Sequence, residues 1–272
     1  MALRLAVVFP GQGTPGGEVG DEIREYVRQY DVDDGELPYQ LSVFVSSIDT
    51  LRKLERNGVK PDVVAGHSLG EYAAACAAGS LGLEDGVRLV AERDRLMTEA
   101  SARNPGGMTA IIGAGAREVA EALNSTNGVV FAANFNTPRQ TVISGEREAM
   151  EVVAGLVGGK KRKLDVAGAF HSPFMREAAE AMEALLTEVP LSDPEMLMIS
   201  GMDGGVLAKA DDVRIALTDQ MLAPVRWVAV VERLATLGVE EVVEAGGGTL
   251  VRMLRDFKDV AIEGRAAKEV LG

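Results

Sequence analysis

Ser68 is the residue whose neighbours most clearly indicate chemistry. It lies in Gly66-His67-Ser68-Leu69-Gly70, between a predicted buried strand at 62–65 and an alanine-rich predicted helix at 71–78. This context is typical of a nucleophile elbow, a sharp turn that lifts a serine Oγ above the edge of a sheet, with free helix N–H groups behind it. We therefore expect Ser68 to be a nucleophile and the N–H of Leu69 to help stabilise an oxyanion. The alternative is an ordinary strand–helix turn in which the serine caps the helix.

A serine nucleophile needs a base, and the chain has only two histidines, His67 and His171. His67 is adjacent to Ser68 on a sharp turn, so its side chain is expected to point away and to be structural. His171 is the candidate base, with a solvated loop histidine as the alternative. In α/β-hydrolases the histidine follows an acidic residue and usually lies near the C-terminus. Because a long segment follows His171 and no carboxylate is an obvious partner, an ordinary lipase or esterase is disfavoured.

The elements that must position these residues alternate between short β-branched runs and longer helical patterns. This alternation predicts an α/β fold with a mainly parallel sheet. The predicted strands are 3–9, 62–65, 196–200 and 239–244, and the predicted helices are 18–30, 40–57, 71–78, 83–102, 173–188, two around Pro224 and a last one after the glycine run 246–248.

The middle of the chain has a different pattern. It reads as strand 108–112, helix 116–124, strands 129–134 and 140–144, helix 146–157 and strand 161–166. The order βαββαβ is that of a ferredoxin-like unit. We therefore expect a small subdomain at 105–167, inserted into a body formed by 1–104 and 168–272.

Composition narrows the function classes. Hydrophobic residues make up 47% and charged residues 25%, and no apolar run is long enough to span a membrane. Forty-one acidic residues against 28 basic ones give a net charge of −13, which disfavours binding to nucleic acid or anionic lipid. The single cysteine, Cys76, cannot form an internal disulfide, and no Cys/His spacing indicates a metal site. The first ten residues lack a cleavage pattern, so we expect a cytoplasmic, metal-free protein.

Several separated motifs occur in one order along nearly the whole chain. They are Phe9-Pro10-Gly11-Gln12-Gly13, the Ser68 segment extended to Glu71-Tyr72, Arg93 in Glu92-Arg93-Asp94-Arg95-Leu96-Met97, 107–113, Asn134-Phe135-Asn136-Thr137-Pro138, Gly168-Ala169-Phe170-His171-Ser172, Gln220 ahead of Pro224-Val225-Arg226-Trp227, and 244–248. In this order they resemble the malonyl-CoA:acyl-carrier-protein transacylases and the related acyltransferase domains of polyketide synthases. The resemblance implies an α/β-hydrolase-like body with a ferredoxin-like insertion, in agreement with the pattern described above.

The resemblance also implies catalytic roles. Ser68 would be the acylated nucleophile, and His171 the base that deprotonates it and later the incoming thiol. The backbone carbonyl of Gln220 would orient His171 in place of a carboxylate. The N–H groups of Gln12 and Leu69 would form the oxyanion hole.

For the substrate, the resemblance assigns Arg93 to the free carboxylate of a malonyl group. A planar guanidinium offers two parallel donors to a carboxylate, a geometry that lysine does not provide. Phe170 resembles the bulky residue common in malonyl-specific members, which favours malonyl over branched extenders. Gln40, Met97 and Asn136 are further candidates for the substrate pocket.

The chain departs from the family pattern at several places. The segment between Gly13 and Tyr39 is shorter than usual, Tyr39-Gln40-Leu41 replaces Thr-Gln-Pro, and Glu244-Ala245-Gly246-Gly247 replaces Glu-Val/Ile-Gly-Pro. These differences concern the pocket rim and the partner rather than the nucleophile.

The only dense basic run is Lys160-Lys161-Arg162-Lys163. It is a candidate surface for CoA phosphates or for an acidic acyl carrier protein. A solvated strand edge is the alternative.

The sequence thus predicts a ping-pong acyltransferase. Malonyl-CoA is the donor, the phosphopantetheine thiol of an acyl carrier protein is the acceptor, and no bound cofactor is expected. Two alternatives remain at this point: a thioester hydrolase, or a transferase for another acyl group, on the same scaffold, and a non-catalytic module that binds the carrier protein. The lifetime of the acyl-enzyme separates transferase from hydrolase.

Overall fold

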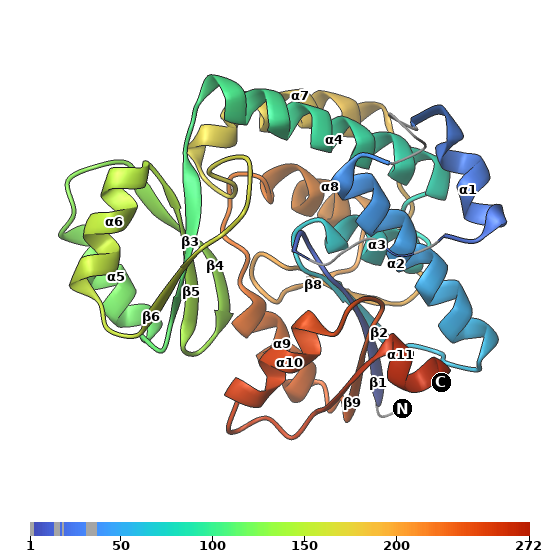
Figure 1. The fold of residues 1–272 in the computed structure, drawn as a ribbon. Coiled ribbons are helices and arrows are strands. Elements are labelled where there is room, and N and C mark those ends of the chain that lie inside the picture. The colour runs from blue at the N-terminus through green and yellow to red at the C-terminus, as the bar shows by residue number, and fades with distance from the viewer. Residues whose placement is uncertain (1–2, 14–16, 18, 31–36) are drawn as a thin grey trace.

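A six-stranded sheet forms the centre of the larger lobe in the computed structural model, which describes residues 3–13, 17, 19–30 and 37–272 (Figure 1). The strand order is β10-β9-β1-β2-β7-β8, and all neighbouring pairs are parallel except β7 and β8. The strands are β1 (Leu5–Phe9), β2 (Val63–Gly66), β7 (Leu197–Ile199), β8 (Val206–Leu207), β9 (Glu241–Glu244) and β10 (Glu263–Ala266).

Helices cover both faces of this sheet, as parallel sheets require. The alternation of β1 shows the result: Val7 and Phe9 pack with α2, α3 and α4 on one face, and Ala6 and Val8 pack with α9 and α10 on the other (Figure 1). The helices of the larger lobe are α1 (Asp21–Val27), α2 (Tyr39–Arg56), α3 (Gly70–Ala77), α4 (Leu83–Arg103), α7 (Arg176–Glu188), α8 (Ala210–Asp219), α9 (Trp227–Thr236), α10 (Thr249–Met253) and α11 (Ala267–Leu271), with the short 3₁₀ segments Arg28–Tyr30, Pro173–Met175 and Leu254–Asp256.

The smaller lobe is an antiparallel sheet of order β4-β5-β3-β6. Its strands are β3 (Gly107–Ile112), β4 (Val130–Thr137), β5 (Gln140–Gly145) and β6 (Lys160–Lys163). The helices α5 (Ala116–Asn124) and α6 (Arg147–Leu156) pack on one face through a separate apolar cluster, whereas Ala110 and Val142 of the other face belong to the core of the larger lobe (Figure 1). Backbone hydrogen bonds between β4 and Val225 join the lobes: Val225 N–H donates to Ala133, and Phe135 N–H donates to Val225.

The predicted fold class, a mainly parallel α/β body with a ferredoxin-like βαββαβ unit, is confirmed. Several predicted elements were wrong in detail. The expected helix at 18–30 begins at Asp21 and tightens into a 3₁₀ turn after Val27, while residue 18 lies outside the described residues. The single expected C-terminal helix is two short helices separated by the edge strand β10, and β8 was missed. Edge strands need no apolar alternation, so the polar sequence of β10 gave no signal.

No helix in the described part of the chain is long and apolar enough to cross a membrane.

Candidate active site

The turn that carries Ser68 is fixed by close backbone packing. The strand β2 ends at Gly66, α3 begins at Gly70, and Ser68 between them has a left-handed φ of 54°. A Cβ on Gly70 would lie 2.1 Å from the carbonyl oxygen of Phe9, and one on Gly66 would lie 2.1 Å from the N of Glu71. Only glycine fits at either position, so the two glycines are required for the serine to stand at the end of the sheet.

His171 lies directly against the serine. Its Nε2 is 2.9 Å from Ser68 Oγ, and its Nδ1 is 2.8 Å from the carbonyl oxygen of Gln220 and 3.2 Å from that of Ala223. Because carbonyl oxygens only accept, Nδ1 must carry the proton, which leaves the Nε2 lone pair free to accept the Ser68 hydroxyl proton. The geometry is that of a nucleophile and an oriented base.

The loop that presents His171 is held on both sides. A Cβ on Gly168 would lie 2.1 Å from Ser101 Oγ on α4, so the chain approaches this helix as only glycine allows. After the histidine, the Ser172 hydroxyl donates to the Ala169 carbonyl at 2.6 Å. These contacts hold His171 at a left-handed φ of 55°.

The charge state of His171 follows from its surroundings. Burial and the nearby positive charge of Arg93 lower its pKa to about 4, although its hydrogen bond to the Gln220 carbonyl acts in the opposite direction. The imidazole is therefore neutral at pH 7, as a general base must be.

Arg93 is 1% exposed and points at the same serine. Its NH2 group donates to Ser68 Oγ at 3.2 Å and to the side-chain oxygen of Gln220 at 3.4 Å, and its NH1 group donates to the side-chain oxygen of Gln40. The Tyr72 ring lies 5.9 Å from the guanidinium carbon. Burial lowers the pKa of Arg93, but an arginine remains protonated in a protein. Its Nε is buried without a hydrogen-bond partner among the described residues, which leaves one donor unsatisfied.

Gln40 and Met97 complete the first set of contacts around Arg93. The Gln40 amide nitrogen donates to Met97 Sδ at 3.5 Å, and its backbone N–H donates to an Asp94 carboxylate oxygen at 3.3 Å. Contacts between α2 and α4 thus hold the Gln40 side chain in the position where it accepts from Arg93.

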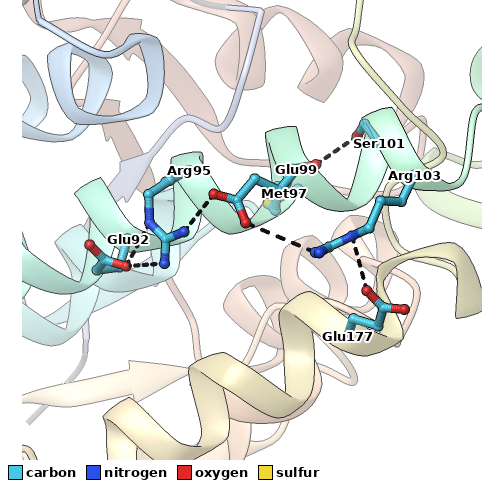
Figure 2. Close-up of polar contacts among 7 residues, drawn as sticks. All are labelled: Glu92, Arg95, Met97, Glu99, Ser101, Arg103 and Glu177. Carbon is cyan, nitrogen blue, oxygen red and sulfur yellow. Dashed lines mark hydrogen bonds and ion pairs between the residues drawn. The ribbon is translucent and has the colours of Figure 1, made fainter.

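The exposed face of α4 carries a row of ion pairs (Figure 2). Arg95 pairs with Glu92 and with Glu99 along the helix, and Arg103 reaches Glu177 on α7 at 3.1 Å. Surface ion pairs of this kind contribute little energy each. The Arg103–Glu177 pair does connect α4, which carries Arg93, to α7, the helix that follows the His171 loop.

A cavity of about 830 Å³ lies beside these groups, lined by both lobes. Gln12, Gln40, Met97 and Phe170 of the predicted site line it, and Phe170 is 5% exposed. Ser68 and Arg93 are not themselves lining residues. Ser68 follows the lining residue His67 in sequence, and Arg93, which contacts Ser68, also contacts the lining residue Gln40. The backbone N–H of Leu69 donates to no protein acceptor within the described part of the chain, so it is available to a bound oxyanion.

Asn136 also lines the cavity, but both ends of its side-chain amide have protein partners. Its oxygen is 2.9 Å from His67 Nε2, and its nitrogen donates to Gln140 at 3.0 Å. His67 packs 5.6 Å from the Trp227 ring, and burial lowers its pKa. This pair therefore links β4 of the smaller lobe to the Ser68 turn.

The basic strand β6 presents its side chains to two different faces. Arg162 lines the cavity, and by strand alternation Lys160 lies on the same face. Lys161 donates instead to the carbonyls of Val157 and Gly159, and Lys163 pairs with Glu151 on α6 at 2.8 Å. Of the three predicted partner-binding residues, Arg162 and Lys160 thus lie on the cavity face, whereas Lys161 points away from the cavity.

Glu71 is a site residue to which sequence reasoning gave no role. It is 1% exposed, accepts the Gly201 N–H at 3.0 Å and accepts from the Gln220 side chain at 3.3 Å. Burial raises its pKa to about 8. The available signal was an acidic residue in the first turn of a helix whose remaining residues are apolar or small.

No group of three or more His, Cys, Asp or Glu side chains close enough to hold a metal ion occurs within the described residues. The Cys76 thiol is desolvated, which raises its pKa to about 12 and makes it a poor nucleophile.

Comparison with known proteins gives consistent results. The acyl transferase domain family matches residues 28–246. The malonyl CoA-acyl carrier protein transacylase of Bacillus subtilis is 32% identical in an alignment of 295 positions, which covers 95% of this chain and 93% of that protein. The crystal structure of the malonyl-CoA:acyl carrier protein transacylase of Xanthomonas oryzae is similar with a TM-score of 0.89 and 30% identity, covering 98% of this chain and 95% of that one. A malonyl-transacylase solved in complex with its type II polyketide-synthase acyl carrier protein has a TM-score of 0.85 at 28% identity, with 97% and 94% coverage.

Proposed function

This chain belongs to the acyl transferase domain family, among the malonyl-CoA:acyl-carrier-protein transacylases, and we propose that it moves a malonyl group from malonyl-CoA to the phosphopantetheine thiol of an acyl carrier protein. One observation carries the proposal. The Ser68 hydroxyl lies 2.9 Å from a neutral, carbonyl-oriented imidazole and 3.2 Å from a buried guanidinium. The first contact serves acyl transfer, and the second serves an acyl group that ends in a carboxylate.

The first half-reaction forms the acyl-enzyme. His171 Nε2 takes the hydroxyl proton as Ser68 Oγ attacks the thioester carbonyl carbon. The N–H groups of Gln12 and Leu69 stabilise the oxyanion that develops. As the carbon–sulfur bond breaks, the imidazolium returns its proton to the leaving CoA sulfur, and a malonyl–serine ester remains.

The second half-reaction reverses these roles. The thiol of the carrier protein's phosphopantetheine enters the cavity, His171 removes its proton, and the sulfur attacks the ester carbonyl. Collapse of the second oxyanion breaks the bond to Ser68 Oγ, which recovers its proton from His171. The Gln220 carbonyl keeps Nδ1 protonated throughout. Nε2 is therefore the ring nitrogen that takes up and returns the proton in both half-reactions.

Selectivity for malonyl follows from Arg93. Its positive charge is buried, and its bonds to Gln40, Gln220 and Ser68 go to neutral oxygens. A carboxylate two carbons from the serine ester gives this charge an anionic partner, whereas acetyl leaves it without one. Phe170 lines the same cavity and restricts branched acyl groups.

The acidic carrier protein is proposed to approach the cavity face of β6. Arg162 and Lys160 lie on that face, where they attract acidic side chains or CoA phosphates despite the net charge of −13. We further propose residues 105–167 as the bounds of the small subdomain that supplies this face.

No bound cofactor is required in this scheme, because the thioester itself is the activated donor. A cytoplasmic setting, where malonyl-CoA and carrier proteins meet, fits a chain with one cysteine.

Intact-protein mass spectrometry after brief mixing with malonyl-CoA tests the proposal. We expect a malonyl adduct on the wild-type chain that is absent from Ser68→Ala and is discharged by a holo acyl carrier protein. Rapid CoA release without an adduct would identify a thioester hydrolase. A chain that binds the carrier protein but forms no adduct and releases no CoA would be a non-catalytic module.

A further inference from the structure

Gln220 serves the site with two different groups. Its backbone carbonyl accepts from His171 Nδ1 at 2.8 Å, and its side-chain oxygen accepts from Arg93 at 3.4 Å. The base and the guanidinium are therefore both set by one residue at the end of α8, which is 2% exposed. A group that fixes the Gln220 side chain therefore also constrains Arg93, together with Gln40.

The orientation of the Gln220 amide depends on Glu71. A guanidinium only donates, so the amide oxygen must face Arg93 and the amide nitrogen must face the other way. The group on that other side is Oε2 of Glu71, 3.3 Å from the amide nitrogen. The second Glu71 oxygen accepts the Gly201 N–H at 3.0 Å. Burial raises the pKa of Glu71 to about 8, while the Gly201 N–H and the charge of Arg93 favour the ionised form, in which both oxygens are full acceptors. Glutamine has one amide oxygen and cannot accept on both sides in this way.

We propose that Glu71 is a positioning residue of the acyl-transfer site: it holds the Gln220 amide with its oxygen toward Arg93 and thereby keeps the guanidinium beside Ser68. This inference rests on the proposed function, because the benefit of that position is to an acyl group with a carboxylate. Glu71 is in the first turn of α3, directly behind the serine, so the same short segment carries the nucleophile and the group that sets its specificity.

An exchange of the two side chains tests the inference. Glu71→Gln keeps the size and the acceptor for Gly201 but turns a donor toward the Gln220 amide nitrogen, so two donors face each other. The double variant Glu71→Gln/Gln220→Glu restores one donor facing one acceptor, presents a carboxylate oxygen to Arg93, and leaves the backbone carbonyl unchanged. Above pH 8, where Glu71 is ionised, we expect the ratio of malonyl to acetyl transfer onto Ser68 to fall about tenfold in Glu71→Gln. In the double variant the ratio should stay low, because the carboxylate introduced at position 220 gives Arg93 an anionic partner in place of malonyl. Recovery in the double variant is therefore measured by labelling of Ser68.

Glu244→Gln is the matched control. Glu244 is also a buried carboxylate, but it accepts from the backbone N–H groups of Gly248, Thr249, Leu250 and Val251 and has no contact with Arg93 or Gln220. It is expected to lower the melting temperature while leaving the malonyl-to-acetyl ratio unchanged. If Glu71→Gln behaves in the same way, the inference is wrong.

A second readout separates this inference from the proposed function. A fluorophosphonate labels an activated serine directly and needs no malonyl group. Because Arg93 donates to Ser68 Oγ, we expect the labelling rate to change in Glu71→Gln and to recover in the double variant. Wild-type protein that is labelled but forms no malonyl adduct would overturn the proposed function alone. Labelling that is equal in all three proteins would overturn the role of Glu71.

Discussion

Replacing Arg93 by alanine tests the electrostatic basis of selectivity most directly. The guanidinium is buried, and its NH2 group is 3.2 Å from the nucleophile, so a malonyl carboxylate would meet it away from bulk water. Truncating one partner of a buried, hydrogen-bonded charge pair costs about 2–5 kcal/mol. At about 1.36 kcal/mol per factor of ten, the rate of malonyl transfer to Ser68 at low donor concentration should fall by about 30- to 5000-fold.

Acetyl-CoA provides the internal reference. Acetyl has no carboxylate, so its transition state gains nothing from Arg93 and leaves a buried charge without an anionic partner. Its rate in Arg93→Ala should stay level or rise, and the malonyl-to-acetyl ratio should fall by nearly the whole factor. Arg93→Lys keeps the charge but loses the planar pair of donors, so its ratio should lie between the other two. Quenched-flow acylation followed by intact-mass measurement gives all three ratios.

An equal loss for both donors would refute this reasoning. The bond from Arg93 to Ser68 Oγ would then act mainly on the nucleophile, and the guanidinium would not be the carboxylate site. A Gln40→Ala variant run beside it should show a smaller shift in the same ratio, since Gln40 contacts Arg93 rather than Ser68.

Three further outcomes follow from the site. Because burial and Arg93 lower the pKa of His171 from 6.5 to about 4, His171 should add no pH dependence to the acylation rate near neutral pH, and the rate should fall as the pH approaches 4; an apparent pKa near 6.5 would contradict the assignment. The unfolded chain takes up this proton first, so the stability that His171 contributes is present above pH 6.5 and is lost as the pH falls toward 4. Asn136→Ala should lower the free energy of unfolding by about 1–2 kcal/mol in urea titrations with little change in the KM for malonyl-CoA, and a large KM effect would make Asn136 a substrate ligand. Arg162→Glu should raise the KM for the carrier protein by roughly 3- to 10-fold in low salt, whereas Lys161→Glu, the same charge change on the opposite face, should not.

Local patterns in the sequence predicted most of the elements, although β8 and β10 were missed, and they singled out the turn that carries Ser68. The small lobe was predictable because each of its strands and helices has its own period and the order βαββαβ admits few topologies. Ser68 was predictable because two glycines flank it at the positions where a Cβ would collide with backbone atoms 2.1 Å away. In both cases the signal is local in the sequence, although the collision that requires glycine at position 70 is with Phe9 on β1.

The partners of Ser68 could not be derived in this way. On pattern alone Arg93 reads as a solvated helix residue, yet it is one of the largest fully buried side chains. Only the family resemblance assigned it a ligand. Its burial depends on Gln40 from α2 and Gln220 from α8, and no local period encodes contacts between such distant segments. The same holds for Lys161, because the face to which a strand residue points depends on register, which the run of four basic residues does not specify.

Backbone strain occurs at the same two residues that these long-range contacts bring together. Among the described residues, the only non-glycine side chains with a left-handed φ are Ser68 and His171, the two whose side chains meet at 2.9 Å. Such conformations cost on the order of 1–3 kcal/mol each and persist only where the surroundings over-determine them. For Ser68 the surroundings are β1 and α3, and for His171 they are α4 and the two carbonyls at Gln220 and Ala223. Because the constraints come from separate elements, the packing of the whole body sets the distance between Ser68 Oγ and His171 Nε2 before any substrate arrives. A preset distance of this kind is the condition for a base to act without reorganisation.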